Sequence, residues 1–407
     1  MYRLCPMRWP RLTLFVLACC AALGPLSIDI FTPSLPALAS DFGATPDKAQ
    51  WTVSLFMLGF AFSMIVVGPL AERFGKRRLL AAGYAVYLLA TLAILNTDSV
   101  TVLLSARLIQ GMSGCFGVAL SRTLARQFFG TAKEIHVLGM LSSIMMLVPT
   151  LAPFLGGILQ DYWGWQAGFV LMFTVGLLLL LAVNLLPDAA SATSSGGSTL
   201  VTGSFYRVLS NVRYLLPALS AAMAFAGAFV FVLGGPFLLV ESRGMTPYHY
   251  GLLCGLILSG YVVTSACAGR LTDAWGKTRV TQVAWLLLAT GTGVIVISAL
   301  ASHGESVTGL VTGLILYELG LGLLLPCCQA RALAGLGTKD TDTGAGLLFF
   351  LEIAVASVAG VIMASLPLTN TLVLAFVVLA SAIMAGLFFV CEEYLYKIRP
   401  QGHESLT

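Results

Sequence analysis

The sequence has 407 residues, of which 58% are hydrophobic and only 10% are Asp, Glu, Lys or Arg, whereas soluble domains carry about 25% of these charged residues. So little charge cannot cover a water-soluble surface, and the mean hydropathy is +0.93. The net charge of +4 is spread over short clusters, so it provides no basic face that could follow a nucleic acid. The composition indicates that most of the chain lies in a membrane.

The first apolar segment begins directly after three arginines, Arg3, Arg8 and Arg11. This arrangement is typical of a secretory signal peptide. The apolar character, however, continues past Gly24-Pro25 as far as Phe31, and further apolar segments follow. We therefore expect an uncleaved first membrane helix.

Apolar runs of about 20 residues recur along the whole chain, each long enough to cross a bilayer as a helix. A backbone in lipid must satisfy its own hydrogen bonds, and these runs are too long for barrel strands, so the pattern predicts α-helices. The twelve predicted spans are 11–39, 49–70, 78–96, 100–123, 135–159, 165–186, 213–240, 247–270, 278–301, 306–330, 342–366 and 369–392.

The predicted loops differ in charge, which indicates their orientation, because Lys and Arg collect on the cytoplasmic side of a membrane. One set of alternate loops contains Arg73, Lys76, Arg77, Arg78, Arg122, Arg126, Lys133, Arg207, Arg213, Arg270, Lys277, Arg279, Arg331 and Lys339. The opposite loops contain only Lys48 and Arg243. We expect both termini in the cytoplasm, which requires an even number of spans, as twelve is.

A polar segment separates the sixth predicted span from the seventh. Residues 191–199 read Ser-Ala-Thr-Ser-Ser-Gly-Gly-Ser-Thr, a composition typical of a flexible linker. The predicted domains are an N-terminal six-helix bundle (1–186), a cytoplasmic linker (187–212), a C-terminal six-helix bundle (213–392) and a cytoplasmic tail (393–407).

One short motif occurs in both halves. Gly68-Pro-Leu-Ala-Glu-Arg-Phe-Gly-Lys follows the second span, and Gly269-Arg-Leu-Thr-Asp-Ala-Trp-Gly-Lys follows the eighth, 201 positions further on. A parallel repeat of six-helix units is the layout of one large class of transporters. The predicted fold is therefore an all-α membrane protein of twelve helices in two pseudo-twofold-related six-helix bundles.

The repeated loop resembles the signature loop of the major facilitator superfamily. In that family the loop acts as a latch that holds the cytoplasmic side shut. The resemblance implies a latch built from Gly68, Glu72, Arg73, Gly75, Lys76, Gly269, Asp273 and Gly276. Glu72 replaces the usual Asp, and Ala274 stands where the first half has Arg73, so we expect a weaker latch in the second half.

Residues 12–180 resemble the drug:proton antiporters of the bicyclomycin and chloramphenicol resistance group; beyond them the resemblance is thin apart from the repeated loop. The matching stretches are Gly24-Pro-Leu-Ser-Ile-Asp-Ile-Phe-Thr-Pro-Ser-Leu-Pro, Arg107-Leu-Ile-Gln-Gly, Pro149-Thr-Leu-Ala-Pro-Phe-Leu-Gly-Gly and Trp163-Gly-Trp-Gln. In the antiporter pattern of span five, Pro149, Pro153, Gly156 and Gly157 fit, whereas Val148 and Ala152 occupy positions that are usually Gly. The resemblance implies proton antiport.

Four ionisable residues fall inside predicted spans: Asp29, Arg107, Glu318 and Glu352. Each costs at least about 2.5 kcal/mol at the centre of a lipid-facing helix, so such residues usually face a bundle interior or an aqueous cavity. Asp29 and Arg107 match the acidic and basic positions of the resistance exporters, which implies that Asp29 couples transport to protons and that Arg107 regulates it. Purely structural roles for both are the alternatives.

Glu318 and Glu352 are not part of the resistance pattern. Glu318 precedes a Gly by four residues in span ten, as Arg107 does in span four. It could contact a cationic or polar substrate, pair with Arg107 across a cavity, or have a structural role. We assign Glu318, Glu352, Gln110 and Phe229 to the predicted substrate cavity.

No motif indicates an enzyme, a bound metal or a cofactor. The nine Cys lie in or beside apolar runs without metal-ligand spacing to His, and there is no phosphate-binding loop for an ATP-driven pump. We expect a monomeric exporter of the bacterial inner membrane that binds a small molecule and protons, touches lipid and does not bind nucleic acid. We expect it to export small amphipathic molecules, such as drugs, by proton antiport through alternating access; export of an endogenous product, such as a siderophore or metabolite, is the main alternative. An uptake symporter and a membrane-embedded enzyme are less favoured.

Overall fold

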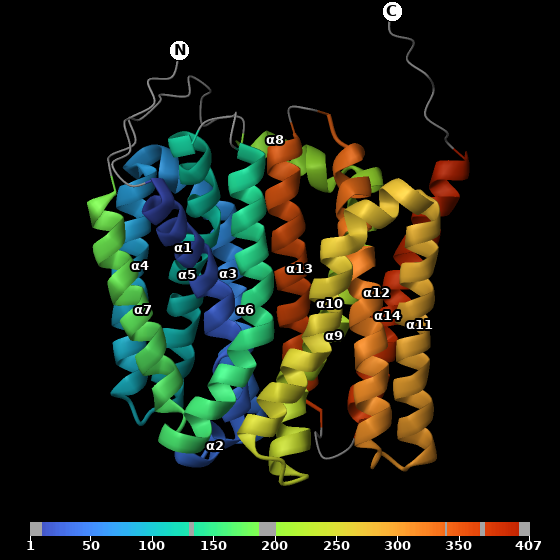
Figure 1. Cartoon of the computed structure of the whole chain (residues 1–407), viewed down its shortest axis with the longest axis horizontal. Coiled ribbons are helices and arrows are strands. Elements are labelled where there is room, and N and C mark those ends of the chain that lie inside the picture. Colours follow the sequence, from blue (N-terminus) through green and yellow to red (C-terminus); the bar gives the residue numbers. More distant parts are fainter. Residues whose placement is uncertain (1–9, 130–133, 187–200, 338–339, 367–370, 399–407) are drawn as a thin grey trace, which may run out of the picture.

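The computed structural model describes residues 10–129, 134–186, 201–337, 340–366 and 371–398. These residues form helices and connecting turns, without a strand among them. The long helices stand side by side and roughly parallel (Figure 1). We call the end at which α1 begins and α14 ends the terminal face, and the end that carries α2 the far face.

The described part of the first half contains eight helical elements and begins with a broken helix. In chain order they are α1 (Pro10–Asp29), the 3-10 helix η1 (Thr32–Ser34), α2 (Leu35–Asp41), α3 (Pro46–Phe74), α4 (Lys76–Leu95), α5 (Val100–Phe129), α6 (Glu134–Trp163) and α7 (Gln166–Leu185). The remaining elements are α8 (Val201–Leu209), α9 (Val212–Gly235), the π-helical η3 (Pro236–Glu241), α10 (Pro247–Trp275), α11 (Lys277–Ala301), α12 (Val307–Ala334), α13 (Thr341–Ala364) and α14 (Thr371–Ile398).

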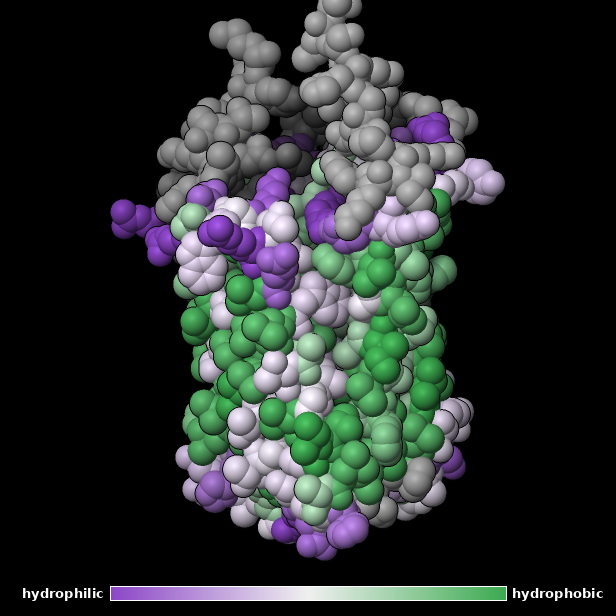
Figure 2. Space-filling model, turned by 90° about the vertical axis from the view of Figure 1, so that its right-hand side faces the viewer, coloured by the Kyte–Doolittle hydropathy of each residue, from purple (hydrophilic) through white to green (hydrophobic). Residues whose placement is uncertain are grey.

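The number of membrane-spanning helices agrees with the sequence prediction. Among the described residues, eleven helical segments are long and apolar enough to cross a bilayer. The 30-residue α6, whose side chains are described only in part, lies between the fourth and fifth of them. Figure 2 shows a broad hydrophobic band between hydrophilic ends on one side of the molecule, as a membrane protein requires.

The first span is not the single helix predicted over 11–39, because it breaks directly after Asp29. Proline lacks a backbone N–H and its ring clashes with the carbonyl of the residue four positions earlier. Pro33 stands in that relation to Asp29, whose carbonyl instead accepts a hydrogen bond from the Thr32 hydroxyl at 2.8 Å. The break places the Asp29 side chain at a helix end in the interior.

The two repeated loops share one backbone geometry. Gly75 ends α3 with φ +83°, and Gly276 ends α10 with φ +82°. This left-handed region strongly favours glycine, and in both halves the next helix begins at the following lysine. Both turns lie at the terminal face (Figure 1), which is consistent with the predicted parallel repeat.

Two helical segments lie in the regions predicted as linker and tail. Residues 187–200 of the linker lie outside the described residues, but 201–209 form α8, whose Val208 is buried against Tyr214 and Leu347. This apolar contact stabilises a helix that the polar composition of the linker does not predict. In the region predicted as the tail, α14 continues to Ile398, and Glu393 pairs with Arg331.

Candidate functional site

Arg107 lies at the centre of the first half and has no solvent exposure. Its Nε donates to the Thr52 carbonyl at 3.1 Å, and its Nη2 donates to the Ser27 carbonyl at 3.2 Å. The guanidinium also lies over the Phe31 and Phe56 rings, 4.3 and 4.4 Å from their centroids. One side chain of α5 thus ties α1 and α3 together.

Gln110, one turn after Arg107, is also fully buried. Its Oε1 accepts from Arg107 Nη1 at 2.6 Å, and its Nε2 donates to Thr91 Oγ1 at 2.8 Å. Within the same half the Ser27 and Tyr87 hydroxyls are 2.5 Å apart. Both polar atoms of the Gln110 side chain are therefore bonded to other side chains of the first half, and Gln110 helps to hold Arg107 in place.

Asp29 is 6% exposed. Its carboxylate forms no ion pair with Arg107 and no hydrogen bond with any described residue. Its electrostatic neighbours belong instead to α10 of the second half, where the Tyr250 hydroxyl and the Cys254 thiol lie within interaction range. The Tyr250 hydroxyl is buried and makes no hydrogen bond within the described part of the chain.

Three of the predicted antiporter residues of α6, Pro153, Gly156 and Gly157, lie at tight contacts near the far face, with α10 of the second half and with the end of the first span. A Cβ on Gly156 would collide with the carbonyl of Ile30, the residue after Asp29. A Cβ on Gly251 of α10 would meet the Pro153 carbonyl, and one on Gly157 would meet the Pro247 carbonyl. Small residues let helices approach this closely in membranes. We call this contact of α1, α6 and α10 the α6–α10 seam.

A second contact joins the halves between α3 and α13. The Ser357 hydroxyl donates to the Ser54 carbonyl at 2.7 Å, and Gly360 leaves room for the Ser54 side chain. Ser54 lies near the start of α3 and Ser357 near the end of α13, and these two helix ends are at the far face. The halves are therefore held together at the far face by two seams.

Glu318 and Glu352 lie in the second half, where they are 3% and 5% exposed. Neither pairs with Arg107. Glu352 Oε1 accepts a hydrogen bond from Gln329 Nε2 at 2.8 Å, whereas the Glu318 carboxylate has no hydrogen-bond partner among the described residues. The Tyr261 hydroxyl lies within electrostatic range of both acids.

Phe229 of α9, the remaining predicted cavity residue, is 7% exposed and stacks on Phe225 with ring centroids 6.0 Å apart. It packs with the hydrophobic core of the first half although it belongs to the second. Its position is therefore between the halves.

The predicted latch residues of the first half contact their own half. Lys76 Nζ approaches Gln127 Oε1 at 3.5 Å, and the neighbouring Arg77 donates to the Leu186 carbonyl at 2.5 Å. Arg73 lies over the Phe74 ring. In the part of the chain that the structure describes, Glu72 and Asp273 form no ion pair, and the Cβ positions of Gly68 and Gly269 face open space.

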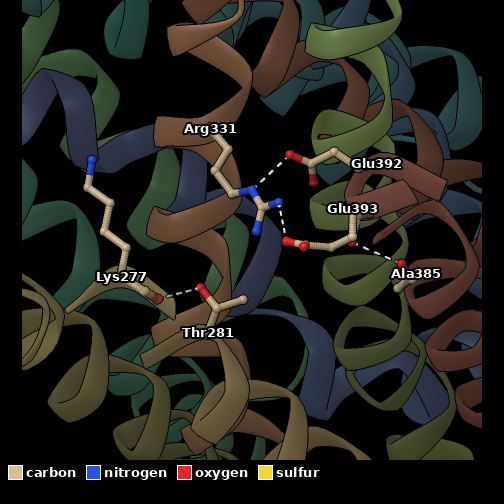
Figure 3. A network of polar contacts seen from close by, with 7 residues as sticks. Lys277, Thr281, Arg331, Ala385, Glu392 and Glu393 are labelled. Atoms are coloured by element: carbon tan, nitrogen blue, oxygen red, sulfur yellow. Dashed lines mark hydrogen bonds and ion pairs between the residues drawn. The ribbon is translucent and has the colours of Figure 1, made fainter. Parts of the chain in front are cut away.

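A charged cluster beside the second latch loop was not predicted. Arg331 of α12 bonds to two successive residues of α14, Glu392 at 2.8 Å and Glu393 at 2.6 Å (Figure 3). Asp273 and Lys277 line the same cavity of about 1030 Å³ at the terminal face. The sequence feature that could have predicted this cluster is the pair Glu392-Glu393 at the end of the last span, because span six ends without such a pair.

The described residues contain no group of three His, Cys, Asp or Glu side chains arranged to hold a metal ion. The chemistry that the structure offers is acid–base and electrostatic: one buried acid beneath a seam, a fixed arginine, and two buried acids in the other half.

The helical architecture, the repeated glycine turns and the two seams are those of a transporter built from two six-helix units. The chain matches the Major Facilitator Superfamily over residues 17–359, and it belongs to that family. It is therefore a membrane transporter for small molecules and not an enzyme.

Several relatives share about a quarter of the sequence. The uncharacterized MFS-type transporter YdgK of Bacillus subtilis (strain 168) is 27% identical over 352 residues, covering 84% of this chain and 86% of that protein. The multidrug transporter MdfA of Yersinia pestis bv. Antiqua (strain Angola) is 25% identical over 306 residues, 72% of each chain. The multidrug resistance protein MdtM of Escherichia coli (strain K12) is 26% identical over 305 residues, 74% of each chain.

Solved structures share the fold. A bacterial homolog of the human lysosomal transporter Spinster, in an inward-facing and unoccupied conformation, aligns with a TM-score of 0.77 at 14% identity, covering 97% of this chain and 99% of that one. The nucleoside transporter NupG aligns with a TM-score of 0.73 at 11% identity, covering 94% and 99%. Identities this low establish the architecture alone.

Proposed function

We propose that this protein exports small amphipathic molecules, antibiotics among them, in exchange for protons, and that it belongs to the bicyclomycin and chloramphenicol resistance group of the superfamily. The observation that carries the proposal is Asp29, a buried carboxyl with no partner in the described part of the chain, placed at a helix break beneath the α6–α10 seam. The two relatives named for multidrug transport or resistance support the choice of cargo.

The terminal face is the cytoplasmic face in this proposal, because the basic loops collect there. The chain is then a multi-pass protein of the bacterial inner membrane with both termini in the cytoplasm, and it acts as a monomer. The bundles 1–186 and 213–392 are its two moving bodies. The seams at the far face close the periplasmic side in the conformation described here.

Proton coupling follows from the position of Asp29. The ionised form of a carboxyl group has a high free energy when the group is buried without a partner, and a much lower one when water surrounds it. Opening the α6–α10 seam would separate Asp29 from Tyr250 and admit periplasmic water, so it would change the relative free energies of the two protonation states of Asp29. Closing the seam would reverse that change. Each transport cycle can therefore move a proton in the direction opposite to the cargo.

Arg107 keeps its bonds within one half during this motion, since Ser27, Thr52 and Gln110 all belong to α1, α3 and α5. Its proposed role is to preserve the geometry around the first span. The glycine-rich loops are proposed to act as latches when the cytoplasmic side closes. In the present conformation Glu72 and Asp273 form no ion pair with any described residue, as expected if the latches form only when the cytoplasmic side closes.

The test is gradient-driven transport by purified protein in liposomes with an imposed pH difference and chloramphenicol as cargo. We expect Asp29→Asn to bind chloramphenicol as the wild type does but to lose at least about 90% of the gradient-driven transport, because the amide does not titrate. Asp98→Asn, the same change at an exposed loop position, is the matched control. Transport by Asp29→Asn within twofold of the wild type would contradict the assignment.

Cargo is tested separately in an efflux-deficient bacterial host. Expression of the wild type should raise tolerance to chloramphenicol, and the Asp29→Asn variant should not. Unchanged tolerance together with increased secretion of a host metabolite would reject drug export and favour the endogenous-product alternative.

A further inference from the structure

The first turn of α10, at the far face, is capped by groups from both halves of the molecule. Its first residue, Pro247, has no backbone N–H, and its second, Tyr248, donates its N–H to Asp161 Oδ2 of α6 at 3.1 Å. The third residue, His249, donates its N–H to the hydroxyl of the N-cap residue Thr246 at 3.3 Å. The first N–H groups of a helix find no acceptor within the helix. A carboxylate of the first half therefore completes the cap of a helix of the second half.

The packing of α6 explains the position of Asp161. Phe154, Gly157 and Asp161 are spaced by three and then four residues, so they lie on one face of the helix. The centroids of the Phe154 and Tyr248 rings are 5.7 Å apart, and a Cβ on Gly157 would meet the Pro247 carbonyl. This face of α6 thus fits against the first turn of α10, and the missing side chain of Gly157 lets the carboxylate come within hydrogen-bond distance.

The segments that carry the two partners of this bond are each fixed within their own half. Directly after α6, Trp165 Nε1 donates to Asp41 Oδ2 at the end of α2, at 2.6 Å. Before α10, the guanidinium of Arg243 donates to the carbonyls of Gly304 and Glu305, in the turn between α11 and α12. When the halves separate at the far face, these segments move with their halves, so the bond between the carboxylate and α10 must break.

A carboxylate at a helix N-terminus is stabilised by the free N–H groups and by the helix dipole. Asp161 is exposed, so water replaces both partners when the bond breaks, and the net contribution of the bond is modest. We propose that Asp161 is a gate residue of the far face: its carboxylate caps α10 only while the far face is closed, and the cap shifts the equilibrium towards that closed conformation. The inference concerns this equilibrium alone, so it is independent of the cargo and of the proton coupling proposed above.

The test measures the distance between the halves at the far face by electron–electron double resonance. Spin labels are attached to Asp98→Cys in the first half and Glu305→Cys in the second, both at exposed loop positions, in the full chain without its native cysteines, in nanodiscs. We expect Asp161→Ala to raise the ratio of the long-distance to the short-distance population about fivefold, the effect of losing an ordinary helix cap. Asp161→Asn should raise it less, because the amide oxygen still accepts a hydrogen bond.

Two control variants separate the gate from simpler effects. Glu241→Ala removes another exposed acid near the far face, and Thr246→Ala removes the cap that α10 receives from its own half. Both should leave the ratio unchanged, since neither alters a contact between the halves. An unchanged ratio in Asp161→Ala would overturn the inference. An equal rise in Glu241→Ala would also overturn it, by assigning the effect to surface charge, as would an equal rise in Thr246→Ala, by assigning it to the stability of the helix end.

Discussion

Arg107 shows how a single buried residue can organise half of a transporter. It has no carboxylate partner among the described residues, and its charge is balanced by carbonyl oxygens, by Gln110 and by three aromatic rings. The guanidinium suits this environment because it is planar, carries five N–H donors and stacks on rings, whereas the ammonium of lysine is a compact, strongly hydrated charge.

Replacing Arg107 with lysine should therefore be damaging although the charge is retained. Lysine cannot reach Ser27, Thr52 and Gln110 together, so at least one buried acceptor loses its donor, at a cost of about 1–3 kcal/mol each. We expect Arg107→Lys to have a lower melting temperature in detergent and slower transport. Arg279→Lys, at an exposed position, is the control, and equal melting temperatures for both variants would contradict the proposed role of Arg107.

At the scale of elements, the α6–α10 seam is the feature that connects the coupling residue to the motion. Gly156 abuts the residue after Asp29, and Gly251 of α10 abuts Pro153. Pro149 and Pro153 both lie inside α6, where each removes a backbone donor. The sequence pattern of span five is thus explained as a close contact between helices of different halves, next to the break of the first span.

A methyl group added at Gly251 should weaken this seam, because it would overlap the Pro153 carbonyl. Cys254 lies one turn away and is 3% exposed, so its reaction with a membrane-impermeant thiol reagent reports on seam opening. In a chain with Cys254 as its only cysteine, we expect Gly251→Ala to raise the labelling rate about fivefold or more, the effect of a shift of roughly 1 kcal/mol.

The control for this experiment is Gly293→Ala on α11, where a Cβ likewise meets nothing within 4 Å. It should leave the labelling rate of Cys254 unchanged. If Gly251→Ala labels no faster than this control, the seam does not limit access to the Asp29 region.

For the whole molecule, the two seams at the far face join the halves, and the proposed export mechanism requires the halves to move against each other there as bodies. Residues of α9 and α13, among them Phe229 and Ile353, pack with the core of the first half, so much of the interface between the halves is apolar. One polar contact across it is the Tyr248 N–H, which donates to Asp161 Oδ2 at 3.1 Å. Such an interface can be remade in a second arrangement with little loss, as alternating access requires.

A covalent link across the α3–α13 seam should stop this motion. The Ser357 hydroxyl lies 2.7 Å from the Ser54 carbonyl, so cysteines at these two positions are near enough to be joined by oxidation. In a background without the nine native cysteines, we expect oxidised Ser54→Cys/Ser357→Cys protein to lose transport and to recover it on reduction. Each single substitution should transport under both conditions. Full activity of the cross-linked protein would reject motion at this seam.

The sequence by itself determined the membrane class, the number of long helices, the repeat and the presence of four ionisable residues in the spans. These properties are local: hydropathy over about 20 residues defines a span, and a glycine with positive φ ends α3 and α10 in the same way. The family resemblance also led to Asp29 and Arg107, because their neighbours in sequence carry the motif.

Only the tertiary structure decided which groups meet. Asp29 forms no ion pair with Arg107 and lies within electrostatic range of Tyr250, Gln110 accepts a hydrogen bond from Arg107, and Gln329 bonds to Glu352. Arg331 is tied to α14, more than 60 positions away. Such contacts depend on which faces of distant helices come together. A helix that is apolar on all sides shows no hydrophobic periodicity, so its sequence does not reveal which of its residues face a given neighbour. The sequence therefore determined the helices and the candidate residues, and the packing of the two halves decided their partners.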